Sequence, residues 1–181
     1  MSKRSFRTIA LAVLCACAVL PAAAPVWGED AALPGGASSL QETYQDWRIA
    51  CEIGDKTKHC SMSQQQVGKN RHRVLAVELQ ASRDSTVTGL LVLPFGLLLD
   101  KGVTLQIDDK PALAPLRFRT CMPAGCLVPL SFDRDRVGAL GKGTALKLKA
   151  TAADTNQEVV LTVSLKGFAA ALDRIKALAG S

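Results

Sequence analysis

Aromatic residues are scarce in this chain, whose 181 residues include one Tyr, two Trp and five Phe. Proteins that hold single-stranded nucleic acid stack its bases on aromatic side chains set among basic ones. Such interleaving does not occur here, and we expect no nucleic-acid partner. The chain also contains no Gly-x-Ser-x-Gly nucleophile motif, no phosphate-binding loop and no dinucleotide fingerprint.

Groups that could carry catalysis are equally sparse. Histidine occurs only as His59 and His72, and many carboxylates stand in turn-like groups such as Asp108-Asp109 and Asp133–Arg136. A catalytic site needs a nucleophile, a base and an orienting group within reach of one another. We therefore expect a non-enzymatic protein without catalytic residues, cofactor or metal. A hydrolase whose site is assembled from scattered Asp, Ser and His is one alternative.

The chain begins with a pattern that is typical of a secretory signal peptide. The apolar stretch Ile9–Leu20 is about a dozen residues long, too short to span a bilayer, which needs roughly 20. Small residues and Pro follow this stretch, and three basic residues precede it, namely Lys3, Arg4 and Arg7. We expect a soluble protein in the periplasm or released to the exterior, with no transmembrane span.

Two cleavage sites compete, and a lipidation site is a third alternative. Cleavage after Gly28 is preferred to cleavage after Ala24, because Pro25 would follow the second cut and fits an extended protease cleft poorly. Lipidation at Cys17 would convert the soluble protein into an anchored one. Removing residues 1–28 leaves 19 bases against 16 acids, since three of the 22 bases and no acid precede the cut. A net charge of +3 is weak evidence for a nucleic-acid partner.

Alternation of apolar and polar residues dominates the rest of the chain and predicts strands. Turn residues separate the alternating segments, which is typical of an all-β fold, either an antiparallel β-sandwich or a barrel-like domain. We expect one such domain over residues 43–181, after a flexible leader at 29–42. The predicted strands cover residues 47–51, 74–79, 86–93, 105–108, 116–120, 126–132, 145–150 and 158–165.

Two segments break the alternation and predict helices. Residues 133–140 suit one or two helical turns that end at Gly141. Residues 167–178 suit a longer helix that packs an apolar stripe on the open face or end of the sheet. That stripe consists of Phe168, Ala171, Leu172, Ile175 and Leu178.

Four cysteines outside the N-terminal stretch form two close pairs, Cys51/Cys60 and Cys121/Cys126. An exported chain meets an oxidising compartment, so we expect two disulfides with this local pairing, each worth about 2–3 kcal/mol. Pairings between distant elements are the alternatives. A zinc site with His59 is disfavoured because zinc ligands usually come as Cys-x2–4-Cys. Neither pair is the Cys-x-x-Cys of redox-active sites.

The most hydrophobic segment after the signal peptide runs from Leu90 to Leu99. We interpret it as buried strand ends joined through Pro94-Phe95-Gly96, because burial of such a run drives folding. An exposed apolar clamp or membrane-inserting tip is the alternative. In a further alternative the domain holds an apolar or lipid ligand between its sheets, lined by Leu91, Leu93 and Leu98.

Segments along the chain resemble the invasion-associated locus B family of exported bacterial envelope proteins. Residues 44–51, Tyr-Gln-Asp-Trp-Arg-Ile-Ala-Cys, resemble the family's Asp-Trp-x-Val-x-Cys opening. Three more regions agree, and the whole resemblance covers about residues 44–175. They are residues 93–96 continuing through 102–108, the Cys-Met-Pro-Ala-Gly-Cys loop at 121–126, and the Ser-Leu-Lys-Gly-Phe ending at 164–168.

This resemblance implies an exported protein linked to host-cell invasion, and it implies no catalytic residues. We expect an interaction module whose partner is an envelope or host-surface protein, with peripheral membrane contact left open. Loops carry recognition on a rigid scaffold, and two loops stand out because one is basic and the other is closed by cysteines. The candidate contact residues are Lys69, Arg71, His72, Arg73, Met122 and Pro123. The plainer interpretation is a solvated turn and a staple between two strands.

Overall fold

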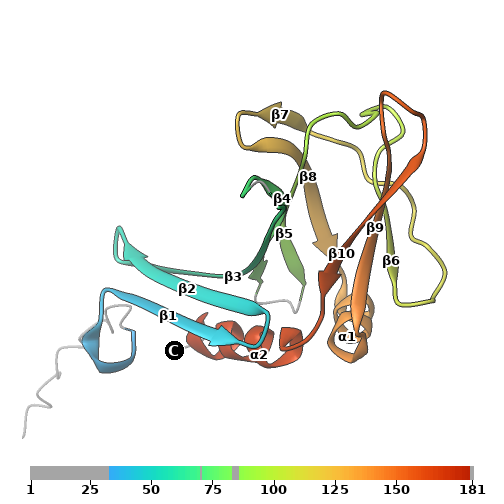
Figure 1. The fold of residues 1–181 in the computed structure, drawn as a ribbon. Helices are drawn as coiled ribbons and strands as arrows, with labels where there is room; N and C mark the ends of the chain where they lie inside the picture. The colour runs from blue at the N-terminus through green and yellow to red at the C-terminus, as the bar shows by residue number, and fades with distance from the viewer. Residues whose placement is uncertain (1–32, 70, 83–85, 180–181) are drawn as a thin grey trace, which may run out of the picture.

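The structure is a computed structural model that describes residues 33–69, 71–82 and 86–179. In this part of the chain, two antiparallel sheets are combined with two α-helices (Figure 1). The all-β fold class is therefore confirmed. The predicted signal peptide, both cleavage sites and Cys17 lie outside the described residues.

The larger sheet has seven strands in the order β1-β2-β3-β4-β5-β8-β7, and every neighbouring pair is antiparallel. Five successive strands form a meander, and the β7–β8 hairpin is added at its end. The strands are β1 (Ser39–Tyr44), β2 (Trp47–Gly54), β3 (Thr57–Val67), β4 (Arg73–Ala81), β5 (Val87–Leu93), β7 (Thr120–Met122) and β8 (Gly125–Phe132).

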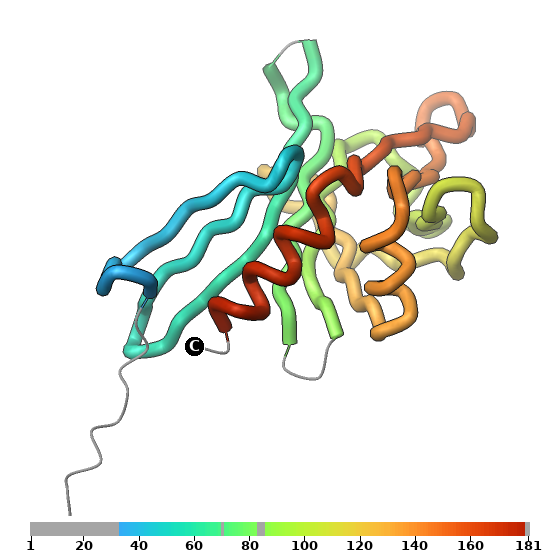
Figure 2. The backbone as a smooth tube through the Cα atoms, turned by 90° about the horizontal axis from the view of Figure 1, so that it is seen from below, coloured from blue at the N-terminus to red at the C-terminus, as the bar shows by residue number. Residues whose placement is uncertain are grey.

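The smaller sheet has three antiparallel strands in the order β10-β9-β6. They are β6 (Thr104–Ile107), β9 (Ala145–Thr151) and β10 (Glu158–Ser164). The helices are α1 (Arg134–Lys142) and α2 (Phe168–Ala179), and a 3-10 turn, η1, spans Pro34–Gly36. In Figure 2, α2 lies alongside β3 on one side of the larger sheet, where it contacts β1 to β4.

Alternation within the strands separates a core side from an outer side. In β4, Leu75, Val77 and Leu79 are buried, whereas Glu78 is exposed on the outer side. The buried residues of the larger sheet form one cluster with those of the smaller sheet and with the predicted apolar stripe of α2. Phe168 meets the ring of Trp47 edge to face, with centroids 5.4 Å apart. The predicted C-terminal helix and its packing are thus confirmed.

A polar seam joins the two sheets at the edge of β10. The carboxamide of Gln64, which is 8% exposed, accepts from Ser164 N at 3.0 Å and donates to Ser164 O at 3.1 Å. Gln66 Nε2 donates to Thr162 O at 2.5 Å. These side chains bond to backbone groups of β10 that could otherwise pair with a further strand. The strand β10 is therefore attached to β3 through side chains and not through a backbone ladder.

Most predicted element ends shift by one to three residues, and four differences stand out. The strand β1 includes residues 39–42, which the composition predicts as part of a flexible leader, and Leu33, in the same predicted leader, is 2% exposed. Both segments are ordered because their apolar side chains reach the core. The helix α1 continues through Gly141 to Lys142. Residues 116–119 form no strand beyond a single bridge between Leu116 and Val103.

The fourth difference is β3, an eleven-residue strand that the alternation did not reveal. Its centre reads Ser-Met-Ser-Gln-Gln-Gln, which lacks an apolar period of two. The strand forms because its core-facing positions carry Met62 and the two seam glutamines, whose amides find backbone partners in β10. The polar side chains of this segment form hydrogen bonds with the edge of β10, and they are not there to face solvent.

Candidate functional site

One face of the larger sheet is open. The helix α2 lies against β1 to β4 on the core side, and no described helix packs on the opposite face (Figure 1). Register aligns polar residues of β2, β3 and β4 across this open face, where Ser63 stands between Arg48 and Glu78. Towards β5 and β8 the same face becomes apolar. Its half-buried residues there are Leu90, Val92 and Leu127.

A hollow of about 420 Å³ lies where β1, β2 and β3 meet near the β1–β2 turn. Its lining is mainly polar and includes no histidine. The lining residues are Thr43, Gln45, Asp46, Trp47, Arg48, Ser63, Gln64, Gln65 and Val67. The hydroxyl of Ser63 therefore has no imidazole base within the hollow, and the arrangement does not provide a nucleophile–base pair.

The two histidines are not brought together. His59 lies at the start of β3 and faces Glu52 across the β2–β3 pair, whereas His72 follows the opposite end of β3. Eight residues separate His59 from Val67, which corresponds to about 26 Å along an extended strand. The hydrolase alternative thus gains no convergent site from them.

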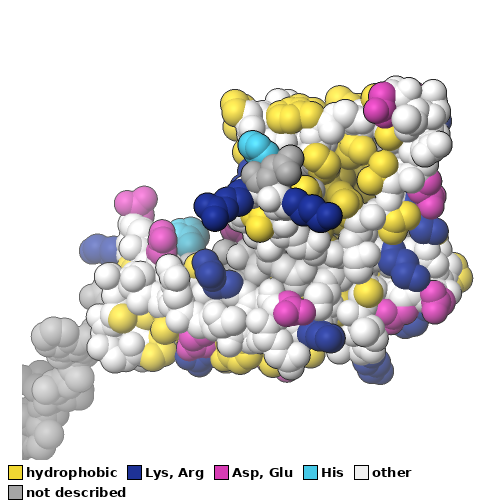
Figure 3. Space-filling view, in the orientation of Figure 1, with side chains coloured by type: hydrophobic (Ala, Val, Ile, Leu, Met, Phe, Trp, Pro, Cys, Tyr) yellow, Lys and Arg dark blue, Asp and Glu magenta, His cyan; other side chains and the backbone are white. Residues whose placement is uncertain are grey.

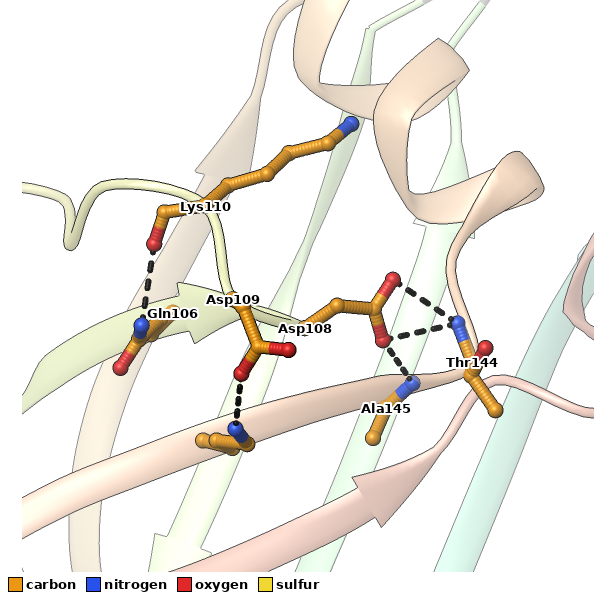
Figure 4. Close-up of polar contacts among 7 residues, drawn as sticks. Gln106, Asp108, Asp109, Lys110, Thr144 and Ala145 are labelled. Carbon is orange, nitrogen blue, oxygen red and sulfur yellow. Dashed lines mark hydrogen bonds and ion pairs between the residues drawn. The ribbon is translucent and has the colours of Figure 1, made fainter.

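The carboxylates of Asp108 and Asp109 also serve separate structural contacts (Figure 4). Asp108 accepts from Thr144 N at 3.0 Å and from Ala145 N at 2.9 Å, which joins the end of β6 to the start of β9. Asp109 forms an ion pair with Lys147 at 2.9 Å. The predicted turn-like role of this pair is confirmed.

The two loops predicted as contact sites lie at one end of the larger sheet. Antiparallel pairing places the end of β3, the start of β4, the end of β5 and the β7–β8 turn together there. Arg73 Nη2 donates to Ala124 O at 2.7 Å, although 51 residues separate them in sequence. The hydrogen bond joins the two loops directly.

The basic tip is defined here as Lys69, Arg71, His72 and Arg73, all of which are exposed. Its backbone is closed by Gly68 N donating to His72 O at 2.9 Å and Arg71 N donating to Gly68 O at 3.0 Å. Residues 64–77 contain no Asp or Glu. No carboxylate near in sequence therefore offsets the positive charge of the tip.

The disulfide turn is defined here as residues 121–126. Cys121 and Cys126 are bonded, with Cα atoms 3.9 Å apart, and Met122 is 53% exposed. Cys51 and Cys60 form the other bond across β2 and β3, with Cα atoms 4.1 Å apart. Both predicted pairings are confirmed, and they consume the thiolates that the zinc alternative would require.

The hydrophobic segment from Leu90 to Leu99 divides into a buried and an exposed part. Leu91, Leu93 and Leu97 are buried, as the core interpretation predicts, but Phe95 is 61% exposed. Leu98 is half-buried, and its backbone N donates to Thr151 O at 2.9 Å. A ligand held by Leu91 and Leu93 would have to displace packed core, since both are 1% exposed.

A charged cluster holds α2 on the edge strand β1. Arg174 donates to both carboxylate oxygens of Glu42, at 2.9 Å from Nε and 2.7 Å from Nη2, and Tyr44 donates to Glu42 at 2.9 Å. The guanidinium lowers the pKa of the Glu42 carboxyl, and the hydrogen bond to that carboxylate raises the pKa of Tyr44. Glu42 and Arg174 lie 132 residues apart, so no local sequence pattern predicts this ion pair.

Comparison with known proteins agrees with this fold. The family described as "Invasion associated locus B (IalB) protein" matches residues 47–176. The chain belongs to the invasion-associated locus B family. Among its relatives, an invasion protein B homolog of Brucella abortus (strain 2308) is 50% identical over 149 residues, covering 82% of this chain and 86% of the relative. Invasion protein B of Bartonella bacilliformis is 41% identical over 150 residues, covering 82% and 81%.

A solved structure extends the family match to three dimensions. The crystal structure of invasion associated protein b from Bartonella henselae superimposes with a TM-score of 0.74 at 42% identity, over 77% of this chain and 97% of that one. The resemblance noted in the sequence motifs is thereby confirmed, as is the family-level link to invasion. Every helix in the described part of the chain is too short or too polar to cross a bilayer.

Proposed function

We propose that the protein is an exported, non-enzymatic interaction module that serves host-cell invasion. Its contact surface is the end of the larger sheet formed by the basic tip and the disulfide turn. The names of its relatives support the link to invasion, and its two disulfides support export to the periplasm or the exterior, where such bonds persist.

The hydrogen bond between Arg73 and Ala124 carries this proposal. It joins two exposed loops, one of which is already closed by a disulfide. A surface ordered before binding loses little conformational entropy when a partner docks. Met122, Pro123 and the basic side chains are thus presented together on a rigid scaffold, as recognition loops usually are.

Crosslinking in cells tests the contact surface. The double variant Arg71→Ala/Arg73→Ala should lower the yield of crosslinked partner roughly tenfold, because it removes charges that steer and hold a partner. Met122→Ala should lower it as well. Lys110→Ala/Lys142→Ala is the charge-matched control, because these exposed lysines lie beyond the far end of β6 and in the last turn of α1.

Two outcomes would contradict the proposal. Equal partner capture by the wild type, by Arg71→Ala/Arg73→Ala and by Met122→Ala would exclude this end of the sheet as the contact surface. Turnover of a glycan or ester substrate that disappears on changing His59 or His72 would establish the hydrolase alternative instead.

A further inference from the structure

We infer that this end of the larger sheet docks on an anionic phospholipid surface, with the basic tip against the headgroups and three apolar side chains in the interface. The inference rests on the proposed function, because it names the partner of the same contact surface. The apolar side chains are those of Val67, Phe95 and Met122, which are 59%, 61% and 53% exposed.

The charge of the tip fits a negative surface. Lys69, Arg71 and Arg73 carry three positive charges within five residues, and no acid occurs between residues 64 and 77. Each base near an anionic membrane strengthens binding by roughly fivefold, and the attraction fades beyond a Debye length. Lipid phosphates are numerous and laterally mobile, so they can move to exposed bases that have no preformed pocket.

Exposed apolar side chains concentrate at the same end. Five large apolar residues are exposed among the described residues, and three of them lie beside the tip or the disulfide turn. Val67 pairs with Arg73, and Met122 lies in the disulfide turn that Arg73 contacts. Phe95 lies two residues beyond Leu93, which pairs with Cys126. Bases next to exposed apolar side chains are the composition of surfaces that rest in the membrane interface.

The shape of this end favours a flat surface over a pocketed partner. The β3–β4 hairpin projects from the body (Figure 2), and basic and histidine side chains gather there beside hydrophobic ones (Figure 3). Protein hot spots need anchors that fill desolvated pockets, whereas here the anchors themselves protrude. The 420 Å³ hollow reaches Val67 but includes none of the tip bases.

Nearby acids limit the area of contact. Glu78 lies further along β4 on the open face. The β9–β10 turn, joined to this end by Ala153 N donating to Gly96 O at 2.8 Å, carries Asp154, and Glu158 begins β10 directly after it. A bilayer that covered the whole open face or the β9–β10 turn would meet these carboxylates. The docked area is therefore confined to the tip and the disulfide turn.

Vesicle co-sedimentation of the exported chain with both disulfides intact tests this inference. Vesicles of phosphatidylcholine mixed with an equal part of phosphatidylglycerol should retain the protein, and vesicles of phosphatidylcholine alone should not. Arg71→Ala/Arg73→Ala should lower partition into the anionic vesicles roughly twentyfold, and Lys110→Ala/Lys142→Ala should leave it unchanged. Phe95→Ala and Met122→Ala should each lower it several-fold, and these exposed positions should leave the thermal midpoint unchanged.

Absence of vesicle binding, equal binding to neutral and anionic vesicles, or unaltered binding by the tip variant would overturn the inference. If the tip variant loses a crosslinked protein in cells and the wild type does not bind vesicles, the proposed interaction module is supported and its partner is a protein. If vesicles bind through the tip and crosslinking finds no protein, the lipid partner is established.

Discussion

At the scale of single residues, the core and the cysteines follow from local patterns, but the polar contacts do not. Periodicity alone identifies the buried stripe of α2, because helical spacing places those residues on one face whatever they pack against. The contacts of Glu42 and Gln64 depend on partners 132 and 100 residues away. Only the folded chain reveals them.

Replacing Glu42 by Gln should weaken the attachment of α2 to β1. Because Arg174 lowers the pKa of Glu42 in the folded state, the ion pair contributes stability above the carboxyl's unfolded pKa and loses it as pH falls through the folded pKa. The variant should melt a few degrees lower at neutral pH, since the pair is partly exposed. Thermal melts from neutral to acidic pH measure this, and a variant that keeps the same acid-side loss as the wild type would contradict it.

Two Gly→Ala substitutions should have opposite effects. Gly125 has φ of 133°, and a Cβ there would lie 2.5 Å from Leu93 O, so Gly125→Ala should destabilise by about 2 kcal/mol or more. Gly138 is helical with nothing within 4 Å of its Cβ position, so Gly138→Ala should stabilise by roughly 0.5–1 kcal/mol. Urea unfolding measures both, and equal effects would contradict the geometry.

At the scale of elements, strands with an apolar partner face were predictable and β3 was not. Its glutamines resemble a solvated segment in sequence, yet Gln64 is buried because a neighbouring strand edge supplies its hydrogen bonds. The contact surface was likewise only partly predictable from the sequence. Sequence composition indicated both loops. That they lie together follows only from the order of the strands, and that Phe95 and Val67 are exposed beside them is seen only in the folded chain.

Removing the carboxamide of Gln64 should therefore destabilise the join between the sheets. Gln64→Ala leaves the N–H of Ser164 without its present partner, whereas the carbonyl of Ser164 still accepts from Trp47 Nε1 at 3.0 Å. A buried group that is left unsatisfied costs about 1–3 kcal/mol. Gln65→Ala, on the exposed side of the same strand, should change the free energy of unfolding by less than about 0.5 kcal/mol. Similar urea midpoints for the two variants would refute the role of the seam.

At the scale of the whole molecule, the two disulfides staple one sheet at opposite ends. Cys51–Cys60 lies in the β2–β3 hairpin and Cys121–Cys126 in the β7–β8 hairpin, with short sequence separations of nine and five residues. Replacing either pair by Ser should lower the free energy of unfolding by about 2–3 kcal/mol. Only loss of the second pair should also weaken vesicle binding, because that pair alone shapes the contact surface.

The processing of the exported chain is a separate prediction at this scale. The intact mass of the exported protein should correspond to a chain that begins at Glu29 and contains two formed disulfides. A mass that corresponds to a chain beginning at Pro25 would place the cleavage site after Ala24. A mass that includes acyl chains on Cys17 would show an anchored lipoprotein. Non-reducing peptide mapping of the same sample should recover only the local cysteine pairs.

The glutamine seam has a consequence for how copies of this protein meet one another. An unpaired strand edge is a template on which a second chain can add a strand, and it leads to aggregation. Along β10, the carbonyl of Thr162 and both backbone groups of Ser164 are already bonded to side chains of β3. A second copy therefore finds this stretch of edge occupied, and crowding at a cell surface should not drive copies to polymerise through it.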